Sequence, residues 1–280
     1  MGVIETLILT TAIAGVAGTG LGGIIGTLLQ KDSNRIASLL LSFAAGVMLS
    51  VVCFDLAAEA VETNVGVITV IVSIAVGVMV IYLLNYIIDM KTNPEVPHID
   101  ENHPKTADSL DELIHSDHYE HHQQKENDNK FALFVAGVVM AGAIALHNVP
   151  EGMTIGAAYA SDNGVMGSAA LVLAVLIGLH NIPEGMAVAV PLITGGMAKW
   201  KAVLITASSG IPTIVGALLG YLLGEIGPLG LALSLGFASG AMLYVVFGEI
   251  LPQAILMYRS KLPAFSAIGG ILVGMLIIFA

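Results

Sequence analysis

The sequence predicts an all-α integral membrane protein with eight transmembrane helices, arranged as three, two and three around an inverted repeat. Three observations lead to this fold class. The chain has 280 residues, of which 56% are hydrophobic and 11% charged, and its mean hydropathy of +0.88 is far above that of soluble domains. Apolar runs recur along the whole chain, and parts of the sequence are repeated.

The apolar runs have the length that a membrane span requires. A hydrocarbon core about 30 Å thick needs about 20 apolar residues as helix. The first run lacks the basic start and the cleavage signal of a leader peptide, so we expect it to remain as a helix. We predict helices 1 to 3 within 1–90, helices 4 and 5 within 131–195, and helices 6 to 8 within 196–280. The runs lie at 4–30, 36–61, 65–89, 131–159, 167–195, 201–224, 229–257 and 263–280.

The basic residues predict how the helices are oriented. All ten Lys and Arg fall in the connections after helices 1, 3, 5 and 7. Cytoplasmic connections of membrane proteins carry an excess of Lys and Arg. We therefore predict that these connections are cytoplasmic and that both termini face outward. The ten residues are Lys31, Arg35, Lys91, Lys105, Lys125, Lys130, Lys199, Lys201, Arg259 and Lys261.

The first three helices and the last three are related by a shift of 194 residues. This shift places 43–49 (FAAGVML) over 237–243 (FASGAML), and 22–29 (GGIIGTLL) over 216–223 (GALLGYLL). Five spans separate the copies, so they cross the membrane in opposite senses. Inverted repeats with a polar site where they meet are typical of secondary transporters, although a duplication kept only for packing gives the same pattern.

A second repeat lies between these copies and carries polar residues. The segment 146–153 (LHNVPEGM) recurs 33 residues later as 179–186 (LHNIPEGM), on adjacent and therefore antiparallel helices. Four positions separate His from Glu in each copy, which places both side chains on one face of a helix. Both copies lie near the middle of an apolar run, where an ionisable residue is costly and is by default functional.

Four side chains of this repeat are predicted to bind one divalent metal ion: His147, Glu151, His180 and Glu184. Two imidazoles and two carboxylates suit Zn²⁺ and also Fe²⁺, Mn²⁺, Co²⁺ and Cd²⁺. The two Glu charges balance one such cation. Hydrogen-bonded core residues are the alternative. Asn148 and Asn181 are open to two roles, metal binding or capping of a broken helix turn.

Two prolines indicate irregular helix turns beside the metal site. Pro150 and Pro183 each remove one backbone hydrogen bond and displace the carbonyl four residues earlier. In membranes such breaks survive only where protein or a wet cavity satisfies the freed groups. We therefore expect a hydrated site that opens to one side at a time, with the metal as a transported substrate and not a cofactor.

The connection 91–130 differs in composition from the rest of the chain. It holds ten acidic residues, four Lys and six His, so over half of the net charge of −11 lies there. Its low hydrophobicity predicts disorder. We expect its histidines to capture metal loosely near the cytoplasmic face or to sense it, a solvated tether being the alternative. They are His98, His103, His115, His118, His121 and His122.

These motifs resemble a known family, the ZIP (Zrt/Irt-like) metal transporters, and most closely its bacterial broad-specificity members with His-Asn-x-Pro-Glu-Gly on helices 4 and 5. The resemblance covers essentially the whole chain. It implies metal uptake into the cytosol by a homodimer, with an elevator-like shift of helices 1, 4, 5 and 6 against helices 2, 3, 7 and 8. It also implies a second metal site that adjoins the first and uses Asn148 and Asn181.

Three further acids lie in the predicted spans. Asp55 and Glu59 are four residues apart on helix 2, and Glu249 aligns with Asp55 under the shift of 194. The resemblance implies that the helix 2 acid marks an outer entrance to the pathway and Glu249 an inner exit. The alternatives are polar packing between the repeats and, for Glu59, simple solvation at a membrane face.

One position departs from the family pattern. Similar bacterial proteins carry an acid on helix 6, in a Ser-Gly-x-x-Glu-Pro context, that bridges two metals. This chain has Thr213 after Ser209, Gly210, Ile211 and Pro212. We expect from this difference that one metal binds strongly and that the second site is weak or empty.

Two other functions compete with a carrier. An intramembrane zinc hydrolase would use a bound metal to activate water, but catalytic zinc usually has an additional acid or base, and the two halves of this motif are nearly identical. A metal-selective channel could share the same ligands, although a tight four-ligand site favours slow, alternating release. Nothing in the sequence suggests nucleic-acid binding.

Overall fold

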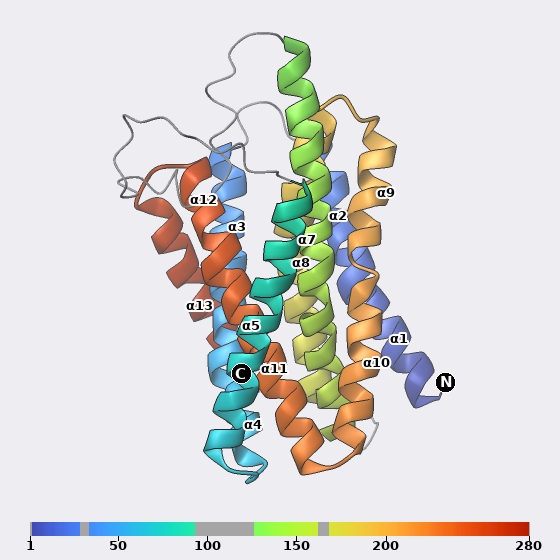
Figure 1. Ribbon diagram of the computed structural model, residues 1–280, viewed down its shortest axis with the longest axis vertical. Helices are drawn as coiled ribbons and strands as arrows, with labels where there is room; N and C mark the ends of the chain where they lie inside the picture. Colours follow the sequence, from blue (N-terminus) through green and yellow to red (C-terminus); the bar gives the residue numbers. More distant parts are fainter. Residues whose placement is uncertain (1, 29–33, 93–125, 162–167, 280) are drawn as a thin grey trace.

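The computed structural model describes residues 2–28, 34–92, 126–161 and 168–279, and every regular element among them is helical (Figure 1). The predicted all-α fold class is therefore confirmed. The α-helices are α1 Val3–Ala12, α2 Gly18–Gly26, α3 Asn34–Val51, α4 Ala57–Glu62, α5 Val67–Thr92, α7 Glu126–Ser161, α8 Ser168–Thr194, α9 Lys199–Ser209, α10 Pro212–Glu225, α11 Pro228–Val245, α12 Leu251–Met257 and α13 Leu262–Phe279. Three π-helical segments continue α1 into α2, α3 into α4 and α11 into α12: Ile13–Ala17, Val52–Leu56 and Val246–Ile250.

Seven helical stretches among the described residues are long and apolar enough to cross a membrane, and they coincide with seven of the eight predicted spans. The remaining predicted span, 131–159, lies within α7, which packs against α8 and α10 along the bundle (Figure 1). The count of eight stays a prediction. The seven stretches are Val3–Gly26, Ser38–Glu62, Val67–Ile87, Ala169–Thr194, Lys199–Glu225, Pro228–Met257 and Leu262–Phe279.

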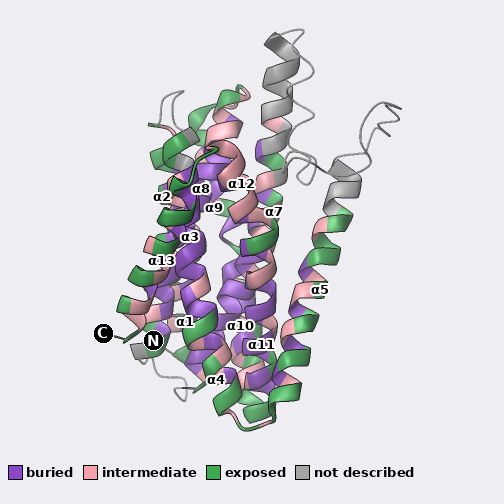
Figure 2. Ribbon diagram, turned by 90° about the vertical axis from the view of Figure 1, so that its left-hand side faces the viewer, coloured by how far each residue is buried: buried purple, intermediate pink, exposed green. Residues whose placement is uncertain are grey.

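Burial follows the expectation for a bundle in lipid. Figure 2 shows buried residues concentrated on α3, α7, α8 and α11, whereas α5 is largely exposed. Its exposed side chains are nevertheless apolar, among them Ile68, Val72 and Met79. Such a surface is unstable in water and stable against acyl chains.

The proline positions produce two corrections. The predicted helix 201–224 is interrupted, because α9 ends at Ser209 and α10 begins at Pro212, which has no N–H to donate to the preceding turn. In contrast, α7 and α8 continue through Pro150 and Pro183, so the breaks predicted there do not interrupt either helix. The helices on either side of the predicted connection 91–130 reach into it, since α5 extends to Thr92 and α7 starts at Glu126.

The two predicted copies run in opposite directions along the bundle. In Figure 1, α1 and α2 rise from the N-terminus, whereas α9 and α10 descend. The most extensive helix contacts pair α7 with α10, α8 with α2, α3 with α13 and α5 with α11. When the first copy is exchanged for the second, and α7 for α8, the pair α7–α10 becomes α8–α2 and the pair α3–α13 becomes α11–α5. The π-helical segments Val52–Leu56 and Val246–Ile250 also lie at equivalent positions under the shift of 194.

Glycine contacts repeat in the same way. A Cβ on Gly22 would collide with the carbonyl oxygen of Ile182, and a Cβ on Gly216 would collide with that of Val149. The two glycines are related by the shift of 194, and Val149 and Ile182 are related by the shift of 33. Two hydrogen bonds also occur at equivalent positions of the two copies. Ser73 Oγ donates to the carbonyl of Leu233 at 2.7 Å, and Ser266 Oγ donates to the carbonyl of Leu39 at 2.6 Å. These equivalent contacts support the inverted repeat predicted from the sequence.

The same glycine contacts divide the bundle into two units. Unit 1 comprises α1, α2 and α7 to α10, and unit 2 comprises α3 to α5 and α11 to α13. Among the described residues, nearly every glycine whose added Cβ would come within 3.0 Å of another helix's backbone makes that contact inside its own unit. The exception is Gly230 against Leu223, at the turn between α10 and α11. Helices within a unit are therefore interlocked more tightly than the two units are with each other.

Candidate metal centre

The four motif side chains are buried at the centre of the bundle. His147 and Glu151 lie on α7, and His180 and Glu184 lie on α8, with relative exposures of 3%, 0%, 2% and 1%. The two helices pack against each other. Their close approach to the flanking helices relies on the motif glycines, because a Cβ on Gly152 would collide with the carbonyl of Thr213 and one on Gly185 with that of Thr19.

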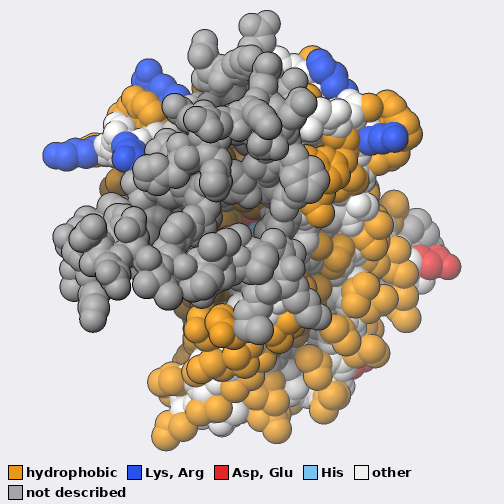
Figure 3. Space-filling model, turned by 45° about the horizontal axis from the view of Figure 1, so that its top comes forward, with side chains coloured by type: hydrophobic (Ala, Val, Ile, Leu, Met, Phe, Trp, Pro, Cys, Tyr) orange, Lys and Arg blue, Asp and Glu red, His pale blue; other side chains and the backbone are white. Residues whose placement is uncertain are grey.

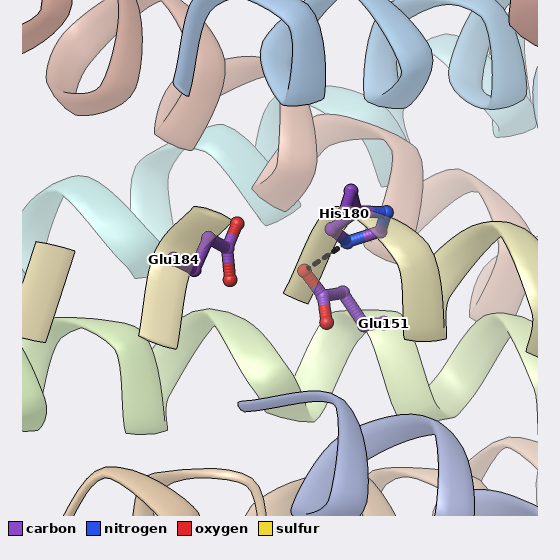
Figure 4. Close-up of side chains that lie close together, drawn as sticks. All are labelled: Glu151, His180 and Glu184. Carbon is purple, nitrogen blue, oxygen red and sulfur yellow. Dashed lines mark hydrogen bonds and ion pairs between the residues drawn. The ribbon is translucent and has the colours of Figure 1, made fainter. Parts of the chain in front are cut away.

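Three of these side chains form a compact cluster. One ligand atom from each of Glu151, His180 and Glu184 lies within 4.8 Å of the others. Figure 4 shows the Glu184 carboxylate turned toward the other two groups, from the same helix as His180 and across from Glu151. The imidazole Nε2 of His180 lies 2.9 Å from Oε1 of Glu151, where a ring N–H can donate to the carboxylate.

Several atoms of the cluster have no hydrogen-bond partner among the described residues. These buried atoms are Oε2 of Glu151, Nδ1 of His180 and both carboxylate oxygens of Glu184. Leaving such groups unpaired in an apolar interior costs free energy. A divalent cation would supply the missing interaction, because it accepts imidazole nitrogen and carboxylate oxygen as ligands.

His147 lies outside this cluster, although it shares a helix face with Glu151. Its Nδ1 atom lies 3.6 Å from Oε2 of Glu249, in the π-helical segment Val246–Ile250. The other carboxylate oxygen of Glu249 accepts a hydrogen bond from the side-chain amide of Asn85 on α5. Ligation of the central ion by His147 therefore stays a prediction.

Asn148 is held by hydrogen bonds at both ends of its amide. Its Nδ2 donates to the carbonyl of Ser209 at 2.8 Å, and its Oδ1 accepts from the hydroxyl of Thr213 at 3.2 Å. The Ser209 carbonyl ends α9, where the helix break leaves it without an intrahelical donor. Asn148 thus binds the carbonyl at the end of α9, and metal binding by Asn148 stays a prediction.

Asn181 has a different environment from its counterpart. Its amide Nδ2 donates to the carbonyl of Ala14 at 3.2 Å, beside the π-helical segment Ile13–Ala17. Its buried Oδ1 has no hydrogen-bond partner among the described residues. The oxygen of Asn181 is thus open to a cation in a way that the oxygen of Asn148 is not.

The helix 2 acids lie apart from the cluster of three. Asp55 belongs to the π-helical segment Val52–Leu56, and its buried Oδ2 has no hydrogen-bond partner in the described parts of the chain. Glu59 accepts a hydrogen bond of 2.7 Å from the hydroxyl of Ser161 at the end of α7. The six loop histidines, from His98 to His122, lie outside the described residues.

Sequence reasoning did not identify Asn85 as a neighbour of the site. A polar side chain inside the predicted span 65–89 was the available signal. Its partner could not be found in this way, because Asn85 and Glu249 are 164 positions apart in the chain and meet only through the packing of α5 on α11.

Comparison with known proteins agrees with this architecture. The family model described as ZIP zinc transporter matches residues 6–280. The chain is 30% identical to the zinc transporter ZupT of Clostridium perfringens over 95% of this chain and 92% of that protein. It is 32% identical to ZupT of Chlorobium chlorochromatii over the same shares, and 39% identical to the zinc transporter ZIP11 of Xenopus tropicalis over 48% of this chain and 40% of that protein. The chain belongs to the ZIP zinc transporter family.

Proposed function

We propose that this protein carries Zn²⁺, and other divalent transition metals of similar ligand preference, through the cluster of Glu151, His180 and Glu184. The observation that carries the proposal is a set of buried nitrogen and oxygen donors without hydrogen-bond partners, on two neighbouring helices of a membrane bundle. Two carboxylates balance one divalent ion, so a loaded site is close to neutral and crosses an apolar region at lower cost than a bare ion.

Family membership decides between transport and catalysis. ZIP proteins are transporters, so this chain is a transporter of divalent metal ions and not an enzyme, and the hydrolase alternative is not favoured. The metal is the transported substrate. Zinc is the substrate named for its relatives, and Fe²⁺, Mn²⁺, Co²⁺ and Cd²⁺ follow from the donor chemistry of the site.

We infer from the family resemblance that transport runs into the cytosol, and we use surface charge to infer which end of the molecule is cytoplasmic. Figure 3 shows the Lys and Arg side chains at the end of the molecule that carries the starts of α3 and α9 and the end of α12. Where the structure describes side-chain burial, the exposed Lys and Arg are Arg35, Lys199, Lys201, Arg259 and Lys261. The positive-inside rule makes this the cytoplasmic end in a bacterial plasma membrane, with both termini outside.

We infer an elevator-type movement from the packing of the two units. Unit 1 contains the metal cluster, and close glycine-to-backbone contacts bind its helices together. The same kind of contact binds unit 2, while the boundary between the units is nearly free of it. A boundary with few close contacts between glycine and backbone lets one rigid body slide along another, which moves the ion without dismantling its ligands.

Cross-linking across the boundary tests this movement. Glu59 of unit 2 and Ser161 of unit 1 are hydrogen-bonded at 2.7 Å, so Glu59→Cys with Ser161→Cys places two thiols together in a Cys53→Ser background. A short bifunctional thiol reagent should stop metal flux, and reduction should restore it. Gly20→Cys with Ala207→Cys, both in unit 1, would bring two Cβ atoms to 3.3 Å and should cross-link without loss of flux. Full flux through a quantitatively cross-linked boundary pair would refute the sliding movement.

Three further features stay proposals. We propose that Thr213, hydrogen-bonded to Asn148, leaves one strong metal site and a weak or empty second one. We propose that the His-rich connection captures metal loosely on the cytoplasmic side. A homodimer rests on the family resemblance.

Flux into proteoliposomes tests the transport proposal directly. Purified protein should move Zn²⁺ and Cd²⁺ into metal-free vesicles with a rate that saturates, because each ion must occupy the cluster before it is released. Mn²⁺ and Fe²⁺ measured in parallel give the preference among metals. A rate that rises linearly with concentration, without saturation, would favour a channel, and flux equal to that of empty vesicles would overturn the proposal.

A further inference from the structure

Glu249 is oriented by a hydrogen bond from one side chain, and a second side chain lies beside it. The amide of Asn85 donates to its Oε1, and the imidazole Nδ1 of His147 lies 3.6 Å from its Oε2. The carboxylate lies in a π-helical segment, a local irregularity that is frequent at functional sites. The His147 side chain is 4% exposed and that of Glu249 is 19% exposed, so the pair lies between the buried cluster and more accessible space.

The spacing of this pair fits a shared cation. Zinc binds imidazole nitrogen and carboxylate oxygen at about 2.0–2.2 Å, so two tetrahedral ligand atoms of one ion lie roughly 3.3–3.6 Å apart. The distance of 3.6 Å from Nδ1 of His147 to Oε2 of Glu249 is of this size. His147 is one helical turn from Glu151, on the side where α7 begins, which is also the end that carries the basic residues (Figures 1 and 3).

The arrangement exists on only one side of the pseudo-symmetric bundle. Asp55 is the equivalent of Glu249, but a shift of 193, which places Ser73 on Ser266, places Asn85 on Ile278. Isoleucine has no donor, and the buried Oδ2 of Asp55 has no hydrogen-bond partner among the described residues. The amide of Asn85 therefore orients the carboxylate of Glu249 at the basic end, whereas the equivalent residue, Ile278, cannot orient the carboxylate of Asp55.

We propose that Asn85 is a positioning residue for transport: it holds Glu249 beside His147, so that an ion leaving the central cluster meets a second nitrogen and oxygen pair at the basic end. His147 belongs to unit 1, whereas Asn85 and Glu249 belong to unit 2, so the pair passes the ion from one unit to the other. Asn85 does not touch the ion itself. The proposal rests on the transport function proposed above and adds the residue that orients the acid expected at the inner exit.

The test compares variants in proteoliposomes that contain a fluorescent Zn²⁺ indicator. Asn85→Leu keeps the volume of the side chain and removes its donor, and it should lower the maximal rate about tenfold, the order expected for a lost hydrogen bond to a charged group. The half-saturating Zn²⁺ concentration should change less than twofold, because the central ligands are intact. Asn85→Gln should recover part of the rate, since it keeps an amide donor.

A double-mutant cycle separates positioning from a structural role. If Asn85 acts through Glu249, then Asn85→Leu should have no further effect on the rate of Glu249→Gln. Leu83→Ala, a lipid-exposed change on the same helix, should leave the rate unchanged. Independent and multiplicative losses in the double variant, or an unchanged rate in Asn85→Leu, would overturn the proposal for Asn85. Absence of saturable flux in the unmodified protein would instead overturn the transport function.

Discussion

Glu184→Gln is expected to abolish saturable Zn²⁺ flux and Zn²⁺ binding. Both oxygens of Glu184 lack hydrogen-bond partners among the described residues, and its ligand atom lies within 4.8 Å of those of Glu151 and His180. Removing one charged partner from a buried ionic contact costs about 3–5 kcal/mol, which corresponds to a loss of affinity of roughly a hundredfold or more. Glu151→Ala should behave in the same way.

The same substitution is expected to stabilise the metal-free protein. A buried carboxylate without donors carries a desolvation penalty, and a neutral amide of the same shape reduces it, by about 1–3 kcal/mol. Without metal, thermal unfolding in detergent should therefore begin at a higher temperature for Glu184→Gln than for the unmodified protein. With excess Zn²⁺ the order should reverse, because only the protein that binds the ion gains stability from it.

Equilibrium dialysis measures how many Zn²⁺ ions each chain binds. The unmodified protein should hold one strongly bound Zn²⁺ per chain, because Thr213 supplies a hydroxyl to Asn148 and no charge for a second ion. Glu5→Gln, an exposed change on α1, is the control and should bind as the unmodified protein does. Two strongly bound ions would contradict the proposal for Thr213, and unaltered flux in both Glu151→Ala and Glu184→Gln would overturn the site assignment.

Gly216→Ala is expected to destabilise the protein strongly. The added methyl group would overlap the carbonyl oxygen and carbonyl carbon of Val149 on the neighbouring helix, and these backbone atoms belong to the turn just before Glu151. Overpacking of this kind costs about 1–3 kcal/mol even where side chains can move, and backbone moves less readily. The expected result is a lower unfolding temperature together with reduced flux, because α7 must shift away from α10.

Gly142→Ala is the matched control for this substitution. Gly142 lies on α7, and a Cβ placed there meets no atom within 4 Å. Because alanine stabilises an unobstructed helix position by up to about 1 kcal/mol relative to glycine, this variant should unfold at the same temperature or higher. If Gly216→Ala were as stable as Gly142→Ala, the interlocked packing of unit 1 would be wrong.

Much of the fold and part of the site were predictable from the sequence. The lengths of the apolar runs correctly predicted an all-helical membrane protein, and the spacing of His and Glu placed each pair on one helix face. Helix interruptions were harder to predict. Pro212 separates α9 from α10, whereas α7 and α8 continue through Pro150 and Pro183, because the effect of a proline depends on the contacts around the freed carbonyl.

The separation of His147 from the cluster could not be predicted from the motif. The repeat gives His147 and His180 the same local sequence, yet His180 lies beside Glu151 and His147 lies beside Glu249. Their partners come from other helices, and the amide of Asn85 occurs on only one side of the bundle. Two nearly identical motifs therefore acquire different contacts because their flanking helices differ.

The amino-acid sequence by itself determined that this chain is an all-helical membrane protein, since hydropathy acts along the chain and needs no partner, and its motifs carried the resemblance to the ZIP family. Only the tertiary structure decided which donors converge, how Asn148 is held, and where the bundle divides into two units. These properties depend on side chains and glycines that are distant in sequence, and their contacts are set by how closely the helices can pack.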